Sequence, residues 1–208
     1  MLFEATRPGF SGPFFCLIAS GNLRVALDYV DMEKIKGILR AIVRNAALNL
    51  LRVRWHVRPD STAALRAGGC LVICNHCSFL DGVLLALISP APLPFTSERE
   101  QSIDNMFTSS GMKFLAWLGF GSVLPLDSGA PMAIRVALRC LEQRQNVMIF
   151  PDGKITGAHE ITSPQPGVEW LARRTNCTVI SAKIYGAEDH WLFGKNGHKF
   201  FPLIRVEI

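Results

Sequence analysis

Residues 70–82 read CLVICNHCSFLDG, and they predict how this 208-residue chain is built. The first five, CLVIC, are an uninterrupted apolar run, which is typical of a strand buried on both faces of a parallel sheet. A polar turn follows, and GVLLALIS then continues as a helix that ends before Pro90. A second buried strand is predicted at 146–150, directly before FPDGKITG at 150–157. Both polar turns therefore begin at the carboxyl end of a strand, where open α/β sheets bind ligands.

The rest of the chain alternates strand and helix patterns, which predicts an α/β fold with a largely parallel mixed sheet flanked by helices. An N-terminal segment, residues 1–50, precedes the domain expected at 51–208. The predicted helices lie at 32–51, 82–89, 102–118, 130–143 and 167–175, and the predicted strands at 52–58, 70–74, 121–126, 146–150, 178–184 and 199–207.

The helix predicted at 32–51 is basic and amphipathic. Ile35, Ile38 and Ile42 fall on one stripe, and Lys34 and Arg44 fall largely elsewhere. Two interpretations stay open, a helix that packs on the core with a solvated face and a helix that docks on a membrane. The apolar runs elsewhere are shorter than the ~20 residues that a membrane-spanning helix needs. The N-terminus lacks the pattern of a secretory signal.

Charge and hydropathy together favour a membrane surface as the partner. The chain has 22 basic and 17 acidic residues, a net charge of +5 and a pI near 9.0. This balance indicates an anionic partner. Only 19% of the residues are charged, and the mean hydropathy is +0.24. A nucleic-acid partner is disfavoured, since no recognised binding motif is present.

His76 and Asp81 are the first candidates for catalysis. A carboxylate that accepts the proton of one imidazole nitrogen leaves the other nitrogen as a base near neutral pH. Such a pair without a nucleophilic serine suits direct deprotonation of a substrate hydroxyl. The alternative is structural, with His76 capping the turn and Asp81 serving as a favourable anion in the first turn of the helix.

The second turn offers Asp152, Gly153 and Lys154 after Pro151. Lys154 and the exposed backbone N–H groups of such a turn suit a phosphate, although a surface hairpin fits the same residues. The six cysteines include a C-x-x-C pair, Cys74 and Cys77, but a zinc site normally needs a second pair. We therefore expect no metal site, and reduced thiols in a cytoplasmic protein.

Taken together, the two motifs resemble the glycerolipid (lysophospholipid) acyltransferase family. Its hallmark is His-x-x-x-x-Asp followed by Phe-Pro-Glu-Gly. His76 and Asp81 in NHCSFLDG match the first block, and FPDG at 150–153 matches the second. The resemblance covers roughly residues 50–208. The stretches PLDSGAPMAIRVALRCLEQ and VISAKIYGAE look most like the acyltransferase half of the bifunctional acyl-carrier-protein synthetase/2-acylglycerophosphoethanolamine acyltransferases.

This resemblance implies a bacterial O-acyltransferase with a glycerol-3-phosphate acyltransferase-like fold and no cofactor. It would move a fatty acyl group from acyl-carrier protein or coenzyme A to the free hydroxyl of a lysophospholipid, on the cytoplasmic face of the inner (plasma) membrane. His76 would be the general base and Asp81 its orienting carboxylate. The residues implied in substrate binding are Asn75, Ser78, Pro151, Asp152, Gly153 and Lys154.

Two departures from the family pattern bear on the acceptor. Asp152 stands where glutamate is usual, and Lys154 places its cation one position earlier than the commonest form does. A lipid-binding or regulatory relative that keeps the fold without turnover is the alternative function.

Overall fold

The computed structural model describes residues 23–98, 106–121, 123–126, 130–151, 155, 166–194 and 197–208. The chain divides into two compact units, Met1–Ile42 and Val43–Ile208. All the strands that the structure describes belong to the second unit. The strands are β1 (Val53–His56), β2 (Cys70–Cys74), β3 (Phe95–Glu98), β4 (Val123–Leu126), β5 (Val147–Ile149), β6 (Thr178–Tyr185) and β7 (Ile204–Glu207). The helices are α2 (Leu23–Leu50), α3 (Pro59–Ala67), α4 (Asp81–Ile88), α6 (Met106–Trp117), α7 (Ala130–Glu142) and α8 (Pro166–Thr175), with a 3-10 turn, η1, at Ala187–Asp189.

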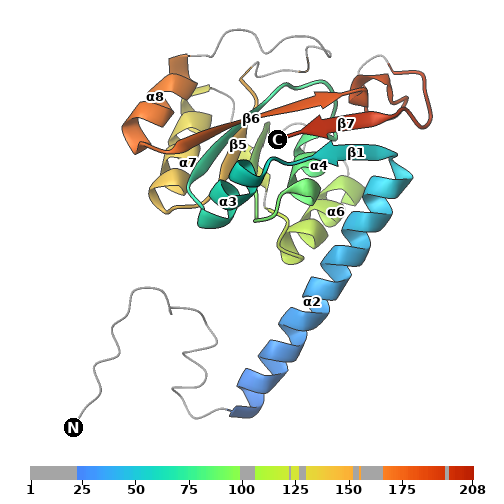
Figure 1. Ribbon diagram of the computed structural model, residues 1–208, viewed down its shortest axis with the longest axis vertical. Coiled ribbons are helices and arrows are strands. Elements are labelled where there is room, and N and C mark those ends of the chain that lie inside the picture. Colours follow the sequence, from blue (N-terminus) through green and yellow to red (C-terminus); the bar gives the residue numbers. More distant parts are fainter. Residues whose placement is uncertain are drawn as a thin grey trace. The chain divides into compact units, whose positions relative to one another are not determined.

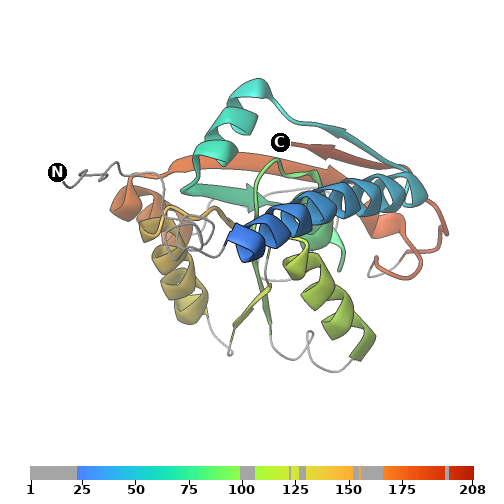
Figure 2. The ribbon, with the colours of Figure 1, turned by 90° about the horizontal axis from the view of Figure 1, so that it is seen from below.

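The seven strands form one sheet in the order β1-β7-β6-β2-β5-β3-β4. Every neighbouring pair is parallel except β6 and β7. Figure 2 shows α7 and α8 on one side of the sheet and α6 on the other. The predicted largely parallel, mixed sheet flanked by helices is confirmed. Because β2 pairs with both β5 and β6, its carboxyl end lies at the centre of the sheet (Figure 1).

The core beneath the sheet comes from the apolar faces that the sequence patterns predict. Ile134, Leu138 and Leu141, one face of α7, pack on a cluster that includes Leu71 of β2 and Val147 of β5. The helix α4 is buried along almost its whole length, with only Val83 partly exposed. This burial matches an apolar helix enclosed between other elements. It also fixes the first residue of α4, Asp81, against the end of β2.

Several elements differ from the sequence prediction. The predicted strand at 52–58 is shorter in the structure, Val53–His56, and Pro59 begins α3, a helix that was not predicted, because proline is preferred in the first helical turn. The four residues of β3 include a single strongly apolar side chain, Phe95, so they carry no strand pattern. The last strand begins only at Ile204, because 199–203 belong to the preceding loop. In β1, Val53 is buried, whereas Trp55 is 46% exposed because β1 lies at the edge of the sheet.

The helix α2 begins nine residues earlier than the predicted position 32 and runs through Leu50. Ile35, Ile38 and Ile42, the predicted apolar stripe, are each more than half exposed. In the part of the chain that the structure describes, no helix is both long and apolar enough to cross a membrane.

Candidate active site

The site is built on the turn that joins β2 to α4. Asn75, the first residue after β2, is buried, and its side-chain amide bonds the backbone of Ile184 twice. Nδ2 donates to the Ile184 carbonyl oxygen, and Oδ1 accepts the Ile184 N–H, both at 2.8 Å. The side chain of Asn75 thus takes the place of a backbone pair and continues the β2–β6 ladder by one residue. These two hydrogen bonds fix the direction in which the chain leaves the strand.

His76 and Asp81 form a hydrogen-bonded pair across this turn. Nδ1 of His76 lies 2.9 Å from Oδ2 of Asp81. The carboxylate is fully buried, and the imidazole is 18% exposed. Because an ionised carboxylate only accepts, the proton of the neutral imidazole lies on Nδ1 and Nε2 keeps its lone pair. Among the described residues, Nε2 has no hydrogen-bond partner, so the geometry leaves a basic nitrogen available.

Asp81 also holds the turn together. Its Oδ2 accepts the backbone N–H groups of Cys77, at 2.6 Å, and Ser78, at 2.8 Å. Its Oδ1 accepts the hydroxyl of Ser78 at 2.5 Å. As the first residue of α4, Asp81 is in addition a favourable anion at the helix N-terminus. The two interpretations of the sequence are therefore not exclusive, since one carboxylate orients His76 and also begins the helix.

Ser78 and Asn75 have their polar atoms engaged inside the protein. Ser78 is fully buried, and its Oγ accepts the N–H of Leu80 while donating to Asp81. These contacts give both residues a role in positioning the turn, a role that the sequence did not reveal.

Phe150 brings the second motif to the first. Its ring stacks on the imidazole of His76, with the ring centroids 4.3 Å apart and the planes 21° from parallel. This contact follows from the sheet, because Ile73 of β2 pairs with Ile149 of β5 and the two chains leave the sheet side by side. The expectation that both turns meet at one edge is thus confirmed for Phe150. Pro151 follows and is buried, and Asp152, Gly153 and Lys154 lie outside the described residues.

The cysteines of the motif are packed beneath the turn. Cys74 and Cys77 are fully buried. Burial raises the pKa of both thiols, and the nearby charge of Asp81 raises it further. Both side chains therefore stay protonated at neutral pH, and neither is an activated nucleophile. Within the described residues, no group of three or more His, Cys, Asp or Glu side chains is arranged to hold a metal ion.

A third segment, absent from the sequence-based site, borders the turn. The N–H of Phe79 donates to the carbonyl oxygen of Phe193 at 3.0 Å, and Ser78 pairs with Gly194 as an isolated antiparallel bridge. The loop after β6 is thereby hydrogen-bonded to the turn that carries His76. No periodic pattern marks this contact, because it joins two irregular segments more than a hundred residues apart.

Two comparisons with known proteins agree with this geometry. Among solved structures, the chain is similar to the 1-acyl-sn-glycerophosphate (LPA) acyltransferase, PlsC, from Thermotoga maritima. The TM-score is 0.57 and the sequence identity is 15%, over 93% of this chain and 80% of that one. That likeness shows a shared fold. The model of the acyltransferase family matches residues 56–185, which include both motifs and strands β2 to β6. Because this match spans more than half of the chain, the protein belongs to the acyltransferase family and is an acyltransferase, as the paired motifs predict.

Proposed function

We propose that this enzyme moves a fatty acyl group from a thioester to the free hydroxyl of a lysophospholipid, with His76 as the general base. The observation that supports this role is the hydrogen bond of 2.9 Å between His76 and the buried carboxylate of Asp81. In an acyltransferase, a base fixed in this way is suited to activate an acceptor hydroxyl directly. The family and the shared fold support the class of acceptor.

The proton has a complete path in this mechanism. Nε2 of His76 takes the proton of the acceptor hydroxyl as its oxygen attacks the thioester carbonyl carbon. Asp81 stabilises the imidazolium that forms, since its carboxylate already accepts Nδ1–H. The tetrahedral intermediate then expels the thiolate, and His76 returns the proton to the sulfur. One carbon–oxygen bond forms, one carbon–sulfur bond breaks, and His76 is restored.

The second motif supplies the acceptor site in this proposal. Phe150 stacks on His76, and Pro151 leads directly into Asp152, Gly153 and Lys154. Gly153 would present a backbone N–H and Lys154 a positive charge to the phosphate of the acceptor. The thioester carrier would be acyl-carrier protein or coenzyme A.

The enzyme would act as a peripheral or monotopic protein on the cytoplasmic face of the inner membrane. A lysophospholipid and its diacyl product both reside in bilayers, and a net charge of +5 favours anionic headgroups. The exposed Ile35, Ile38 and Ile42 of α2 give that helix the apolar side chains of an interfacial anchor.

Transfer from a labelled acyl thioester to a panel of lysophospholipids tests the reaction. Wild type should acylate at least one of them, and His76→Ala should lose about 10²–10⁴-fold in kcat. His56→Ala, which removes an exposed histidine of β1, is the matched control and should keep wild-type kcat. Absence of transfer by wild type to every acceptor would favour the regulatory alternative. Near-full activity of His76→Ala would reject the proposed base.

The phosphate contact is tested separately. Lys154→Ala should raise the KM for the acceptor more than the KM for the thioester, because only the acceptor would carry the phosphate bound there. Lys113→Ala removes an exposed lysine of α6 and serves as the control. An unchanged acceptor KM in Lys154→Ala would remove that residue from the site.

A further inference from the structure

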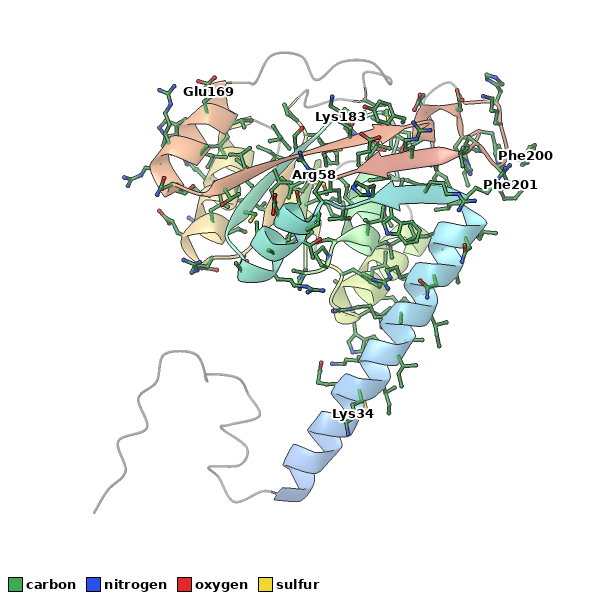
Figure 3. The ribbon with its side chains drawn as sticks, in the orientation of Figure 1. Lys34, Arg58, Glu169, Lys183, Phe200 and Phe201 are labelled. Carbon is green, nitrogen blue, oxygen red and sulfur yellow. The ribbon has the colours of Figure 1, made fainter. Side chains whose placement is uncertain are left out.

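The loop between β6 and β7 exposes an unusual number of large apolar side chains. Each is about half exposed or more, from 49% for Trp191 to 64% for Phe200. Figure 3 shows Phe200 and Phe201 pointing outward, beyond the ends of the strands. Clusters of this kind on a folded surface mark interaction sites. We call the set the aromatic tip, and its members are Trp191, Leu192, Phe200, Phe201 and Leu203.

Hydrogen bonds and a ring contact within the protein fix the conformation of the aromatic tip. The N–H of Trp191 donates to the carbonyl oxygen of Lys199 at 2.9 Å, and the ring of Trp191 lies 4.9 Å from that of Phe200. The carbonyl oxygen of Asp189 accepts two backbone N–H groups, those of His198 and Lys199. The backbone carbonyl of Phe201 accepts a hydrogen bond of 3.3 Å from the guanidinium of Arg52. These bonds therefore fix the loop in a conformation that leaves its apolar side chains exposed to solvent.

The tip is continuous with the catalytic turn. The bond from Phe79 N–H to the Phe193 carbonyl, and the bridge between Ser78 and Gly194, tie the base of the loop to the residues beside His76. Phe79 itself is 55% exposed and adds a further aromatic side chain at this junction. A surface that takes up the tip therefore lies close to the turn that carries His76.

Cations lie beside the tip on the exposed face of the sheet. Arg205 of β7 pairs in register with Arg54 of β1 on one side and with Tyr185 of β6 on the other. Lys183 lies two residues before Tyr185 on β6 and so on the same face, opposite Glu207 of β7 in the strand register. Like charges in directly paired positions are unfavourable unless an anion offsets them. Three cations against one carboxylate make this face complementary to a negatively charged surface.

We infer that the aromatic tip inserts into the interface of an anionic phospholipid bilayer while the cations beside it contact the headgroups. Aromatic side chains at headgroup level with neighbouring lysine and arginine are the pattern of a membrane interface. The inference rests on the proposed function in one respect, that the acceptor is a lipid drawn from this bilayer. An acidic carrier protein would need the cations, but consecutive exposed phenylalanines held outward suit the acyl region of a bilayer better.

Co-flotation with vesicles of phosphatidylcholine and phosphatidylglycerol tests the surface directly. The double variant F200S/F201S should lower the vesicle partition coefficient by roughly tenfold or more, since two large apolar side chains no longer enter the lipid. Trp170→Ser is the matched control. Trp170 is 50% exposed on α8. This helix lies at the start of β6, whereas the tip follows the end of β6 (Figure 1), so Trp170 is outside the proposed membrane surface. Thermal unfolding checks that all variants fold, and Leu192→Ser provides a second, smaller truncation of the tip.

Activity separates this inference from the proposed function. F200S/F201S should lose activity on a lysophospholipid embedded in vesicles, in proportion to its lost binding, yet keep wild-type activity on a short-chain acceptor dispersed as monomers. Unchanged flotation of both tip variants would overturn the inference. So would unchanged flotation with a raised KM for acyl-carrier protein, because the tip would then dock a protein. If wild type acylates neither acceptor but flotation depends on the tip, the proposed function fails and the membrane surface stands.

Discussion

Replacing Asp81 by asparagine should separate the two roles of this carboxylate. Three donors, namely His76 Nδ1 and the N–H groups of Cys77 and Ser78, converge on Oδ2, whereas the hydroxyl of Ser78 and the thiol of Cys77 donate to Oδ1. An asparagine side chain must place its oxygen there, because its NH₂ group would face three donors. The NH₂ then meets Oγ of Ser78, which is able to accept. The tautomer of His76 and the two backbone contacts of the turn are preserved, while the side chain loses its negative charge and the hydroxyl of Ser78 loses its acceptor.

The magnitudes follow from that geometry. A hydrogen bond from an ionised partner contributes roughly 1 kcal/mol more than a neutral one, which corresponds to about tenfold in rate at the imidazolium-like transition state. The full contribution of a general base, about 10²–10⁴-fold, sets the upper limit. We therefore expect D81N to lose between about tenfold and about 10³-fold in kcat. Its stability should fall by about 1–2 kcal/mol, since the anion at the start of α4 is also removed.

Replacing Asp81 by alanine should be much more damaging to the fold. The N–H groups of Cys77 and Ser78 lose their acceptor, and both residues are fully buried. Two unsatisfied buried donors cost about 2–6 kcal/mol, a large fraction of the ~5–15 kcal/mol that stabilises a typical domain.

Denaturant unfolding and steady-state acyl transfer, measured on both variants, check these values. D81N with wild-type kcat would show that the charge of the carboxylate is not used. D81A as stable as D81N would refute the account of the turn. D81N should bind vesicles as wild type does, because Asp81 is buried away from the surface.

Three further outcomes test parts of the site. Phe150→Leu, which removes the stacked ring, should lower kcat about two- to tenfold with little change in either KM, since aromatic stacking contributes about 0.5–1.5 kcal/mol; a change in KM alone, by steady-state kinetics, would contradict a role in positioning His76. Gly82→Ala places its Cβ 2.6 Å from the ring of Phe95. Denaturant unfolding should show a free energy of unfolding lower by about 1–3 kcal/mol, and the additional substitution Phe95→Leu should partly restore it. Wild-type stability of Gly82→Ala would refute the overpacking. Burial lowers the pKa of His190 from its ordinary 6.5, so the unfolded chain binds the proton more readily and the free energy of unfolding should decline as the pH falls below 6.5. His190→Gln should flatten that decline in unfolding curves recorded at several pH values. An unchanged slope would contradict a contribution of His190 to the pH dependence.

The sequence predicted the site where the chemistry follows from local pattern. Two apolar runs each followed by a polar turn were sufficient to place His76 and Phe150 at one sheet edge, because parallel strands present their carboxyl ends together. The pairing of Leu71 with Val147 confirms that the two strands are direct neighbours. The identities of His76 and Asp81 and their spacing then indicated a base and its orienting acid, and the hydrogen bond between them matches that arrangement.

What the sequence did not predict depends on contacts between distant segments. Nothing local indicates that Phe150 stacks on His76, or that the backbone of Phe193 meets the turn at Phe79. In the sequence, the family resemblance implies that Asn75 binds substrate. In the structure, its side chain bonds the backbone of Ile184, which only the pairing of β2 with β6 brings within reach. The buried polar residues of this motif, Asn75, Ser78 and Asp81, therefore build the turn.

The spacing of His76 and Asp81, five positions apart, has a physical origin in this turn. The carboxylate of Asp81, the first residue of α4, reaches back to the N–H groups of Ser78 and Cys77, three and four positions earlier. The side chain five positions earlier then lies beside the same oxygen. With one residue fewer or more between them, the carboxylate would still accept the backbone donors, but the imidazole would leave the turn in another direction. The motif is thus a helix start that also positions a histidine, so that Asp81 contributes to the fold of the turn and, in the proposed chemistry, orients the base.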